Sequence, residues 1–381
     1  MPDAHSWADI DLQALQHNLG RAREFAPGKR VCAVIKANAY GHGVHAIAEA
    51  LLPVLNDGDC VAVATLNEAL ALRQTLEHLQ SKIPVLVLRG PLDIAELDAL
   101  VQGGFHWVMH SKYQAELLKN WLDTHSAAKK PTLNIWLKIN TGMNRLGLRV
   151  DDLQQIWSWL QSLDAPGERV LMSHFATADE HDHALAKTQQ QTFAQITDNL
   201  SGARTRSLSA SAGIVCWPDA HHSIVRPGIM LYGASPMTDT EAAEYGLKPV
   251  MSLKSRLLTI NQVKAGDTVG YGATYHCKED MPVGVIGIGY GDGYPRHAPS
   301  GTPVLVYTQG KVWEAPLAGR VSMDMLTVDL RGIPAVPGDE VLLWGQSWGR
   351  ELPADIIARY AGTIAYELFC QVTSRVKFFY R

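Results

Sequence analysis

A lysine stands at the end of an apolar run, directly ahead of a glycine-rich turn. The run is RVCAVIKA at 30–37, and Lys36 is followed by a turn that contains Tyr40 and then by the helical pattern VHAIAEALLPVL. Burial at a strand end lowers the pKa of an amine and makes it available as a nucleophile or base. Such an amine suits imine formation with an aldehyde cofactor. The alternative is a lysine that extends its ammonium group into solvent.

Two later turns combine glycine with residues that can bind an anion. SLSASAG at 207–213 ends a candidate strand and precedes a helix, and RPGI at 226–229 places a glycine after the last strand of the series. Backbone N–H groups at strand-to-helix turns cradle phosphate groups, and Tyr40 could reach the same phosphate. Together with Lys36, these turns favour pyridoxal phosphate as the cofactor. Taken singly, each is more typical of an ordinary tight turn.

These residues need a scaffold that gathers strand ends, and the first two-thirds of the chain predicts one. Short β-branched runs alternate with helical patterns, which implies parallel strands with helical crossovers. About eight such units match a (β/α)8 barrel, whose catalytic groups lie at the carboxyl ends of the strands. The expected strands are 30–37, 60–66, 83–90, 106–111, 133–140, 169–176, 206–211 and 222–233, with helices at 67–79, 111–125 and 151–163.

Near residue 240 the pattern changes to strands joined by Gly, Asp and Pro, which predicts a mainly antiparallel β domain. We therefore predict an α/β protein with a TIM-like barrel at 1–240 and a β domain at 241–381. The first ten or so residues contain an alternating piece that could pair with the β domain. The expected strands here are 250–263, 281–291, 302–315, 322–330, 339–345 and 374–381, with one helix at 352–361.

Composition narrows the classes of partner. The 381 residues include 34 basic and 38 acidic ones, and a net charge of -4 argues against nucleic acid or an anionic membrane. We see no leader and no apolar segment long enough to cross a bilayer. Five scattered cysteines without a CxxC pair are typical of reduced thiols, so we expect a cytoplasmic protein. They are Cys32, Cys60, Cys216, Cys277 and Cys370.

In order along nearly the whole chain, eight segments resemble the bacterial alanine racemases. The lysine segment and the YGATY segment are together highly specific for that family. The segments are AVIKANAYGHG (33–43), LKINTGMNRLGLR (137–149), SHFATADE (173–180), SASAG (209–213), VRPGIMLYG (225–233), VGYGATY (269–275), IGYGDGYPR (288–296) and GRVSMDM (319–325).

The resemblance implies a pyridoxal-phosphate-dependent enzyme of fold type III that interconverts L-alanine and D-alanine. It implies a homodimer whose active site borrows residues from the partner's β domain. Racemisation by this route needs two bases on opposite faces of the α-carbon of the substrate aldimine. By resemblance, Lys36 first holds the cofactor as an imine and then serves one face, while Tyr271 of the β domain serves the other.

The resemblance also implies a set of residues around the cofactor. Arg226 faces the pyridine nitrogen, and because an arginine keeps its proton, that nitrogen stays unprotonated. The ring is then a weaker electron sink, which favours clean racemisation over transamination. His174 is expected to link Tyr271 to Arg226. The implied cofactor-binding residues are Lys36, Tyr40, His174, Ser211, Arg226, Gly228 and Ile229.

The substrate carboxylate is expected to meet Arg145 and the backbone N–H of Met323. Asp324 and Tyr290 line the access route in the family. Lys138 aligns with a lysine that is carbamylated in many relatives and holds that arginine; the alternative is a plain strand lysine. No metal is expected.

Two positions depart from the family pattern. Asn140 stands where relatives often have Asp, and Ser374 stands where some relatives place a phosphate-binding tyrosine, which leaves that contact open. The sequence also leaves open whether D-alanine is made for cell-wall peptidoglycan or removed in alanine metabolism.

Rival functions fit less well. A barrel amino-acid decarboxylase usually carries three consecutive glycines for the phosphate, which this chain lacks, and a broad-specificity racemase would carry an export leader. A cofactor-binding protein without catalysis is usually a lone barrel. A TIM-barrel metallohydrolase could use His181 and His183 in DEHDH (179–183), but that cluster is explained more simply as the N-cap and first turn of a helix.

Overall fold

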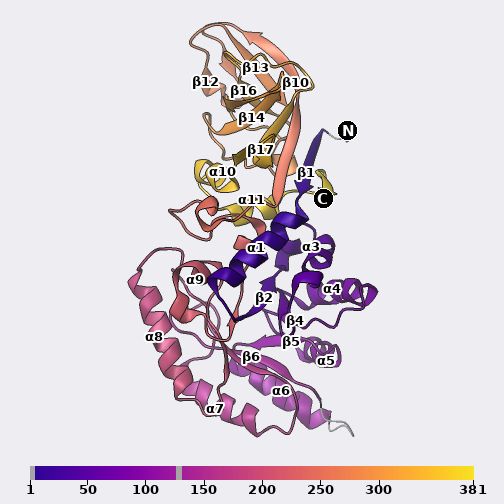
Figure 1. Ribbon diagram of the computed structural model, residues 1–381, viewed down its shortest axis with the longest axis vertical. Helices are drawn as coiled ribbons and strands as arrows, with labels where there is room; N and C mark the ends of the chain where they lie inside the picture. Colours follow the sequence, from indigo (N-terminus) through magenta and orange to yellow (C-terminus); the bar gives the residue numbers. More distant parts are fainter. Residues whose placement is uncertain (1–4, 126–130) are drawn as a thin grey trace.

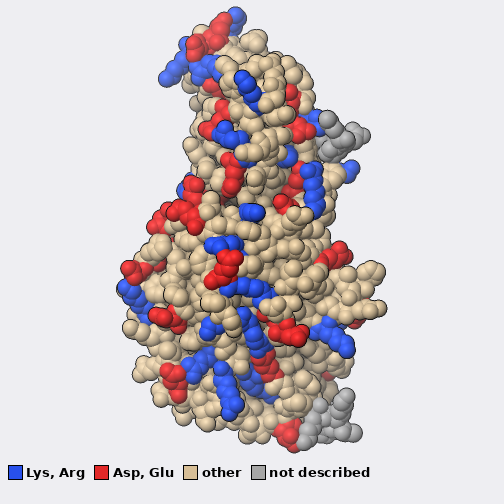
Figure 2. Space-filling model, in the orientation of Figure 1, with Lys and Arg blue, Asp and Glu red and all other residues tan. Residues whose placement is uncertain are grey.

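The computed structural model describes residues 5–125 and 131–381 and has two parts stacked along its long axis (Figure 1). A barrel with surrounding helices forms the lower part, and a β domain forms the upper part. Lys and Arg side chains are interspersed with Asp and Glu over both parts of the face shown in Figure 2. None of the helices in the described part of the chain is long and apolar enough to cross a membrane.

The barrel is a sheet of eight strands, all paired in parallel, in the order β8-β7-β6-β5-β4-β3-β2-β9. It closes where the N–H of Arg226 donates to the carbonyl of Ser209 at 2.9 Å, beside a parallel bridge from Ala210 to Arg226. This confirms the predicted barrel. The strands are β2 (Arg30–Val34), β3 (Cys60–Val63), β4 (Val85–Val87), β5 (His106–Met109), β6 (Asn134–Lys138), β7 (Arg169–Met172), β8 (Thr205–Ser207) and β9 (Ile224–Val225).

Helices follow the strands and lie around the outside of the barrel (Figure 1). Their starts are fixed by polar caps: Thr65, Asp93 and Ser111 each accept a hydrogen bond from a backbone N–H in the first turn of the helix that follows. The helices are α1 (Leu12–Phe25), α3 (Val44–Leu51), α4 (Leu66–His78), α5 (Ile94–Gln102), α6 (Lys112–Thr124), α7 (Val150–Ser162), α8 (Ala184–Asp198) and α9 (Ser211–Cys216).

The β domain is built on β10 (Met251–Val263), which pairs antiparallel with β13, β17 and β1. β1 (Ser6–Ile10) lies between β10 and β19 (Lys377–Tyr380), so the sheet contains strands from both ends of the described chain. The remaining strands are β11 (Thr268–Val269), β12 (Tyr275–His276), β13 (Met281–Ile286), β14 (Pro303–Thr308), β15 (Lys311–Pro316), β16 (Leu326–Asp329), β17 (Glu340–Ser347) and β18 (Arg350–Leu352).

Two features of this domain differ from the sequence prediction. The expected strand 302–315 is a hairpin, because Gln309 and Gly310 adopt φ of 48° and 75° and turn the chain between β14 and β15. A second helix, α11 (Ala365–Gln371), follows the expected one, α10 (Ala354–Ala361). Its short apolar pattern was not recognised as helical.

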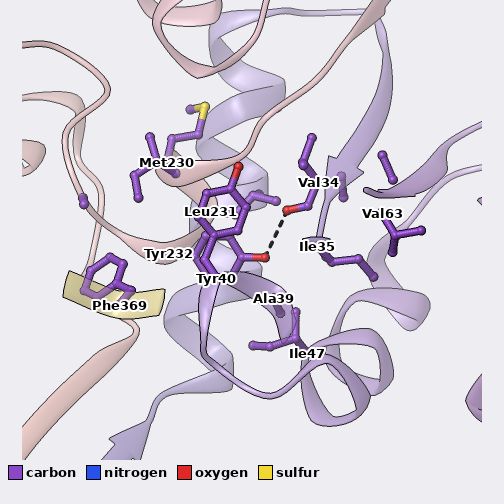
Figure 3. Packing of buried hydrophobic residues seen from close by; sticks show 14 of the residues in the cluster. Val34, Ile35, Ala39, Tyr40, Ile47, Val63, Met230, Leu231, Tyr232 and Phe369 are labelled. Atoms are coloured by element: carbon purple, nitrogen blue, oxygen red, sulfur yellow. Dashed lines mark hydrogen bonds between the residues drawn. The ribbon is translucent and has the colours of Figure 1, made fainter. Parts of the chain in front are cut away.

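Ion pairs hold β1 in the sheet of the β domain, and close packing joins that domain to the barrel. Asp9 on β1 pairs with Lys254 at 2.9 Å and with Arg381 at 2.8 Å. On the barrel side, α11 approaches the turn after β2 so closely that a Cβ at Gly41 would lie 2.1 Å from the Phe369 carbonyl. Figure 3 shows Phe369 near Tyr40 of that turn and near Tyr232 of the segment after β9.

Candidate active site

A cavity of 540 Å³ opens at the carboxyl ends of the barrel strands. It brings together the barrel residues that the sequence pointed to, from β2, β6, β7, α9 and the turn after β9. Its lining includes Lys36, Tyr40, Lys138, Arg145, His174, Ser211, Arg226, Gly228 and Ile229, together with Tyr366.

The turn that carries Lys36 is left-handed. Residues 37–40 have φ between 51° and 54°, a conformation that costs about 1–2 kcal/mol per residue outside glycine. Local hydrogen bonds hold it: the Asn38 side chain accepts from the N–H of Val44 at 2.9 Å, and the N–H of Gly41 donates to the Ala37 carbonyl at 2.9 Å. Strain held by its surroundings is typical of functional sites.

The amine of Lys36 has an environment suited to a base. Burial, and then the positive charge of Arg145, lower the pKa of Lys36, while Glu68 and Cys370 act in the opposite direction. A lowered pKa leaves more of the amine neutral and able to accept a proton.

The opposite side of the cavity can hold a phosphate. A Cβ at Gly228 would lie 2.6 Å from the Tyr40 hydroxyl, so only glycine leaves room between backbone and phenol. The Ser211 hydroxyl accepts from the N–H of Gly228 at 2.8 Å and of Met230 at 3.4 Å, which shows that these N–H groups point at a single spot. These donors fit the phosphate of pyridoxal phosphate.

Tyr40 is a neutral donor in this cradle. Its ring stacks on Tyr232 with centroids 4.7 Å apart, and the Tyr232 hydroxyl donates to the Val34 carbonyl at 3.0 Å (Figure 3). Burial, and then the nearby Tyr366, raise the pKa of Tyr40 far above its ordinary value. Its hydroxyl therefore keeps its proton and can donate it to an anion.

Arg226 and His174 form a connected pair beneath the cavity. The guanidinium of Arg226 is almost fully buried and donates to the Ser207 hydroxyl at 2.6 Å and to the Ser173 carbonyl at 2.7 Å. Burial lowers the pKa of Arg226 to about 10, so it stays charged at neutral pH. Its Nη2 also lies 3.3 Å from His174 Nδ1.

His174 is therefore neutral, with a defined tautomer. Burial, and then the cations led by Arg226, hold the pKa of His174 well below its ordinary value. Because the guanidinium can only donate, Nδ1 is the acceptor and Nε2 carries the proton.

Lys138 is the second amine of the cavity. Burial lowers its pKa to about 8, and the neighbouring Arg226, Arg145 and Lys36 act in the same direction. Asn140, which replaces the expected Asp, organises the loop that leads to Arg145, because its Oδ1 accepts from the N–H groups of Gly142 and Asn144.

The four predicted site residues of the β domain do not line this cavity. Tyr271, Met323 and Tyr290 are 71%, 53% and 38% exposed on the β domain. Asp324 is also exposed and pairs with Arg375 at 2.7 Å. Within one chain, the cavity thus gathers the nine predicted site residues of the barrel and none of the four from the β domain.

Tyr366 is a cavity residue that the sequence interpretation missed. It lies at the start of α11 with its ring centroid 5.8 Å from that of Tyr40. Ser374, the position at which the phosphate contact was left open, lines a different hollow on the β domain, beside Asp324. The signal that could have located Tyr366 is the helical spacing of the buried Ala365, Leu368 and Phe369.

The DEHDH cluster has a structural role at the start of α8. His183 is the N-cap, and its Nδ1 accepts from the N–H of Leu185 at 3.1 Å. His181 lies 3.9 Å from Asp239.

A barrel with an amine at a strand end, a phosphate cradle and a second β domain defines a fold-type-III pyridoxal-phosphate enzyme. Residues 10–236 match the family described as alanine racemase, N-terminal domain, and residues 250–380 match the alanine racemase, C-terminal domain. The chain belongs to the alanine racemase family.

Relatives across the family cover the whole chain. It is 43% identical to the alanine racemase of Shewanella woodyi over 97% of both chains, and 43% identical to that of Vibrio cholerae over 98% of this chain and 97% of the relative. The crystal structure of the biosynthetic alanine racemase of Pseudomonas aeruginosa has a TM-score of 0.89 and 41% identity over 99% of both chains.

A further structure bears on the cofactor. The alanine racemase of Bartonella henselae, described with covalently bound pyridoxal phosphate, has a TM-score of 0.85 and 28% identity, covering 99% of this chain and 100% of that chain. The comparisons do not favour the decarboxylase, the broad-specificity racemase or the metallohydrolase.

Proposed function

We propose that this protein interconverts L-alanine and D-alanine with two bases, Lys36 and the partner subunit's Tyr271. The chain belongs to the alanine racemase family, and this membership supports both the activity and its dependence on pyridoxal phosphate. The observation that carries the roles of the residues is the amine of Lys36 in one cavity with a phosphate cradle and a buried arginine. When bound, the cofactor supplies a ring that withdraws electrons from the α-carbon.

Four residues would hold the phosphate: Tyr40, Ser211, Gly228 and Ile229. Tyr40 donates its hydroxyl proton, and the turn after β9 supplies N–H groups without a Cβ in the way. Arg226 would face the ring nitrogen and donate to it without giving up its proton, since the pKa of its guanidinium remains well above neutral.

Lys36 would serve one face of the α-carbon. Its amine, partly neutral because burial lowers the pKa, accepts the proton there or returns it. The left-handed turn fixes the backbone on which this side chain is carried.

Tyr271 would serve the other face from the partner subunit. A phenol has an ordinary pKa near 10, so it needs a donor to stabilise its anionic form. His174 offers one: with Nδ1 occupied by Arg226, its Nε2–H is free to donate to a phenol oxygen.

The substrate carboxylate would meet Arg145 and the backbone N–H of Met323, with Asp324 and Tyr290 along the access route. We also propose that Lys138 is carbamylated. Its pKa of about 8 leaves neutral amine for carbon dioxide, and the resulting anion would balance the surrounding cations. Labelled bicarbonate should mark Lys138, and Lys138→Ala should lose the mark.

A homodimer would complete the site, because the β-domain residues lie outside the cavity of their own chain. Tyr271, Met323, Tyr290 and Met325 leave an exposed apolar surface on the β domain, which is typical of an interface. We accordingly divide the chain at residue 240, with residues 1–240 binding the cofactor and 241–381 supplying the second base.

We propose a cytoplasmic location and a supply of D-alanine for cell-wall peptidoglycan. The five cysteines are free, and Cys32 and Cys60 remain thiols although they face each other on neighbouring strands. Rescue of a strain that requires external D-alanine would test this role, and failure of an active, expressed protein to rescue it would contradict the role.

The decisive experiment is chemical. The purified holoenzyme should absorb at the blue edge of the visible spectrum, lose that band on borohydride treatment and carry the reduced cofactor on Lys36. Reduced cofactor on another lysine, with Lys36 unmodified, would refute the assignment.

Directional kinetics test the second base. Tyr271→Phe should reduce proton exchange by about 10²-fold or more, with the larger loss in the L-to-D direction. Small, equal losses in both directions would contradict the role of Tyr271.

Subunit mixing tests whether sites are shared. Lys36→Ala and Tyr271→Phe variants should each be nearly inactive, but their mixed dimers should contain one intact site. After co-refolding, about a quarter of the wild-type activity should return. If mixing restores nothing although mixed dimers form, each site belongs to one chain.

A further inference from the structure

The carboxylate of Glu68 reaches from the first turn of α4 to the turn that carries Lys36. Its Oε2 accepts from the N–H of Ala64 at 2.7 Å and of Thr65 at 3.1 Å, which closes the start of α4. Its Oε1 accepts from the N–H of Ala37 at 2.7 Å. Ala37 directly follows Lys36, so one side chain joins the loops after β2 and β3.

We propose that Glu68 is a positioning residue for Lys36: it fixes the start of the left-handed turn and places a negative charge near the amine. The inference rests on the proposed role of Lys36 in the reaction. Glu68 itself does not line the cavity, whereas Ala64 and Thr65 do. It therefore acts through the backbone and its charge, not by contact with the substrate.

The geometry explains why this turn needs an external hydrogen bond. Ala37 is the first of four residues at positive φ, and no glycine relieves the conformation until Gly41. The other end of the turn is held by the bond from Val44 to Asn38. The bond to Glu68 holds the end next to the lysine, where a rotation of the peptide would redirect the amine.

The negative charge of Glu68 acts on the Lys36 amine in the opposite direction to the positive charges around the cavity. The groups that act on the Lys36 amine are Arg145, which lowers its pKa, and Glu68 and Cys370, which raise it. Because Arg145, Lys138 and Arg226 also line the cavity, a nearby carboxylate limits the loss of the protonated amine. A base that must also return its proton needs both its neutral and its protonated form to be populated near the working pH.

The neighbouring helix offers a matched control. Glu96 occupies the same first-turn position on α5, where its Oε2 accepts from the N–H of Leu92 at 2.9 Å and its Oε1 pairs with Arg89 at 2.9 Å. It also accepts a backbone N–H just ahead of its helix, and it has no bond to the Lys36 turn. Glu96→Gln therefore reports the loss of a helix-start carboxylate and of its ion pair with Arg89, without the loss of a bond to the Lys36 turn.

The test measures the amine rather than the turnover. In the full chain freed of cofactor, the rate at which acetic anhydride labels Lys36 is followed against pH by mass spectrometry. Glu68→Gln should lower the pKa of the Lys36 amine and so raise its labelling rate near neutral pH, because a negative charge is lost. Glu96→Gln should leave the labelling profile of Lys36 unchanged.

Glu68→Asp separates the effect of the hydrogen bonds of Glu68 from the effect of its charge. It also replaces Glu68→Gln as the test if that variant does not fold. It keeps the charge but cannot span to both loops, so the dissociation constant for pyridoxal phosphate should rise about tenfold. Three results would each overturn the inference. They are an unchanged labelling profile of Lys36 in Glu68→Gln, an equal change of that profile in Glu96→Gln, and wild-type affinity for the cofactor in Glu68→Asp. Borohydride labelling of Lys36 in the wild-type holoenzyme tests the proposed function independently of these outcomes.

Discussion

The phenols around the cavity differ in what their surroundings let them do. Tyr40 is buried and keeps its proton, while Tyr271 is exposed on the β domain. Tyr366 lies between these extremes, at the cavity beside Tyr40. Because Tyr366 lines the cavity beside Tyr40, we expect its hydroxyl to add a donor to the phosphate cradle.

Tyr366→Phe should therefore weaken cofactor binding. Loss of one hydrogen bond to a charged group raises the dissociation constant for pyridoxal phosphate by about tenfold. Equilibrium dialysis or the recovery of visible absorbance measures this. Ser374→Ala is the control, since Ser374 lies in a different hollow, and an equal effect of both variants would contradict the placement.

Single residues were predictable where strand ends determine their position. Lys36, His174 and Arg226 follow β2, β7 and β9, so the barrel itself brings them together. Tyr366 was missed because its approach to Tyr40 depends on how α11 packs against the barrel, and local sequence does not encode that contact. Ser374, eight residues beyond Tyr366 in the sequence, lies in a different hollow on the β domain.

At the scale of elements, the left-handed turn after β2 makes a specific prediction. Ala37→Gly should leave stability unchanged or raise it by about 0.5 kcal/mol, because glycine adopts positive φ without strain. Ala71→Gly, at an exposed right-handed position in α4, should lower stability by about 1 kcal/mol. Urea unfolding of both variants measures the difference, and equal losses would contradict a strained turn.

The sequence predicted the order of elements better than their ends. Alternating βα units led to the barrel, whereas the expected strand 30–37 stops at Val34 because the chain turns left-handed. Nothing in KANAY favours that conformation except Asn38, and the contacts that impose it come from Glu68 and Val44. The hairpin of β14 and β15 was missed for a different reason, since Gln309 and Gly310 are only a weak turn signal inside an apolar run.

For the whole molecule, buried histidines predict acid sensitivity. Burial lowers the pKa of His42 and of His106 to about 4, against an ordinary value near 6.5. The unfolded chain therefore binds protons that the folded chain excludes, and stability falls as pH drops from about 6.5 towards 4. Each histidine should remove about 2 kcal/mol from the free energy of unfolding at pH 5.

Urea unfolding at pH 7 and pH 5 tests whether the free energy of unfolding falls as the pH is lowered. In His42→Phe the decrease in the free energy of unfolding between pH 7 and pH 5 should be smaller by about 2 kcal/mol, since residue 42 then gains no proton on unfolding. His5, exposed on the surface, supplies a matched site, and His5→Phe should show the wild-type loss. An unchanged loss in His42→Phe would show that other groups dominate acid unfolding.

The place of β1 in the sheet has a consequence for biosynthesis. Ser6 is among the first described residues and pairs with Ser255, so this strand must wait unpaired while the barrel and β10 are translated. The β domain made alone would have an empty slot between β10 and β19. A synthetic peptide of residues 5–11 supplied in trans should occupy that slot and restore the fragment's cooperative unfolding.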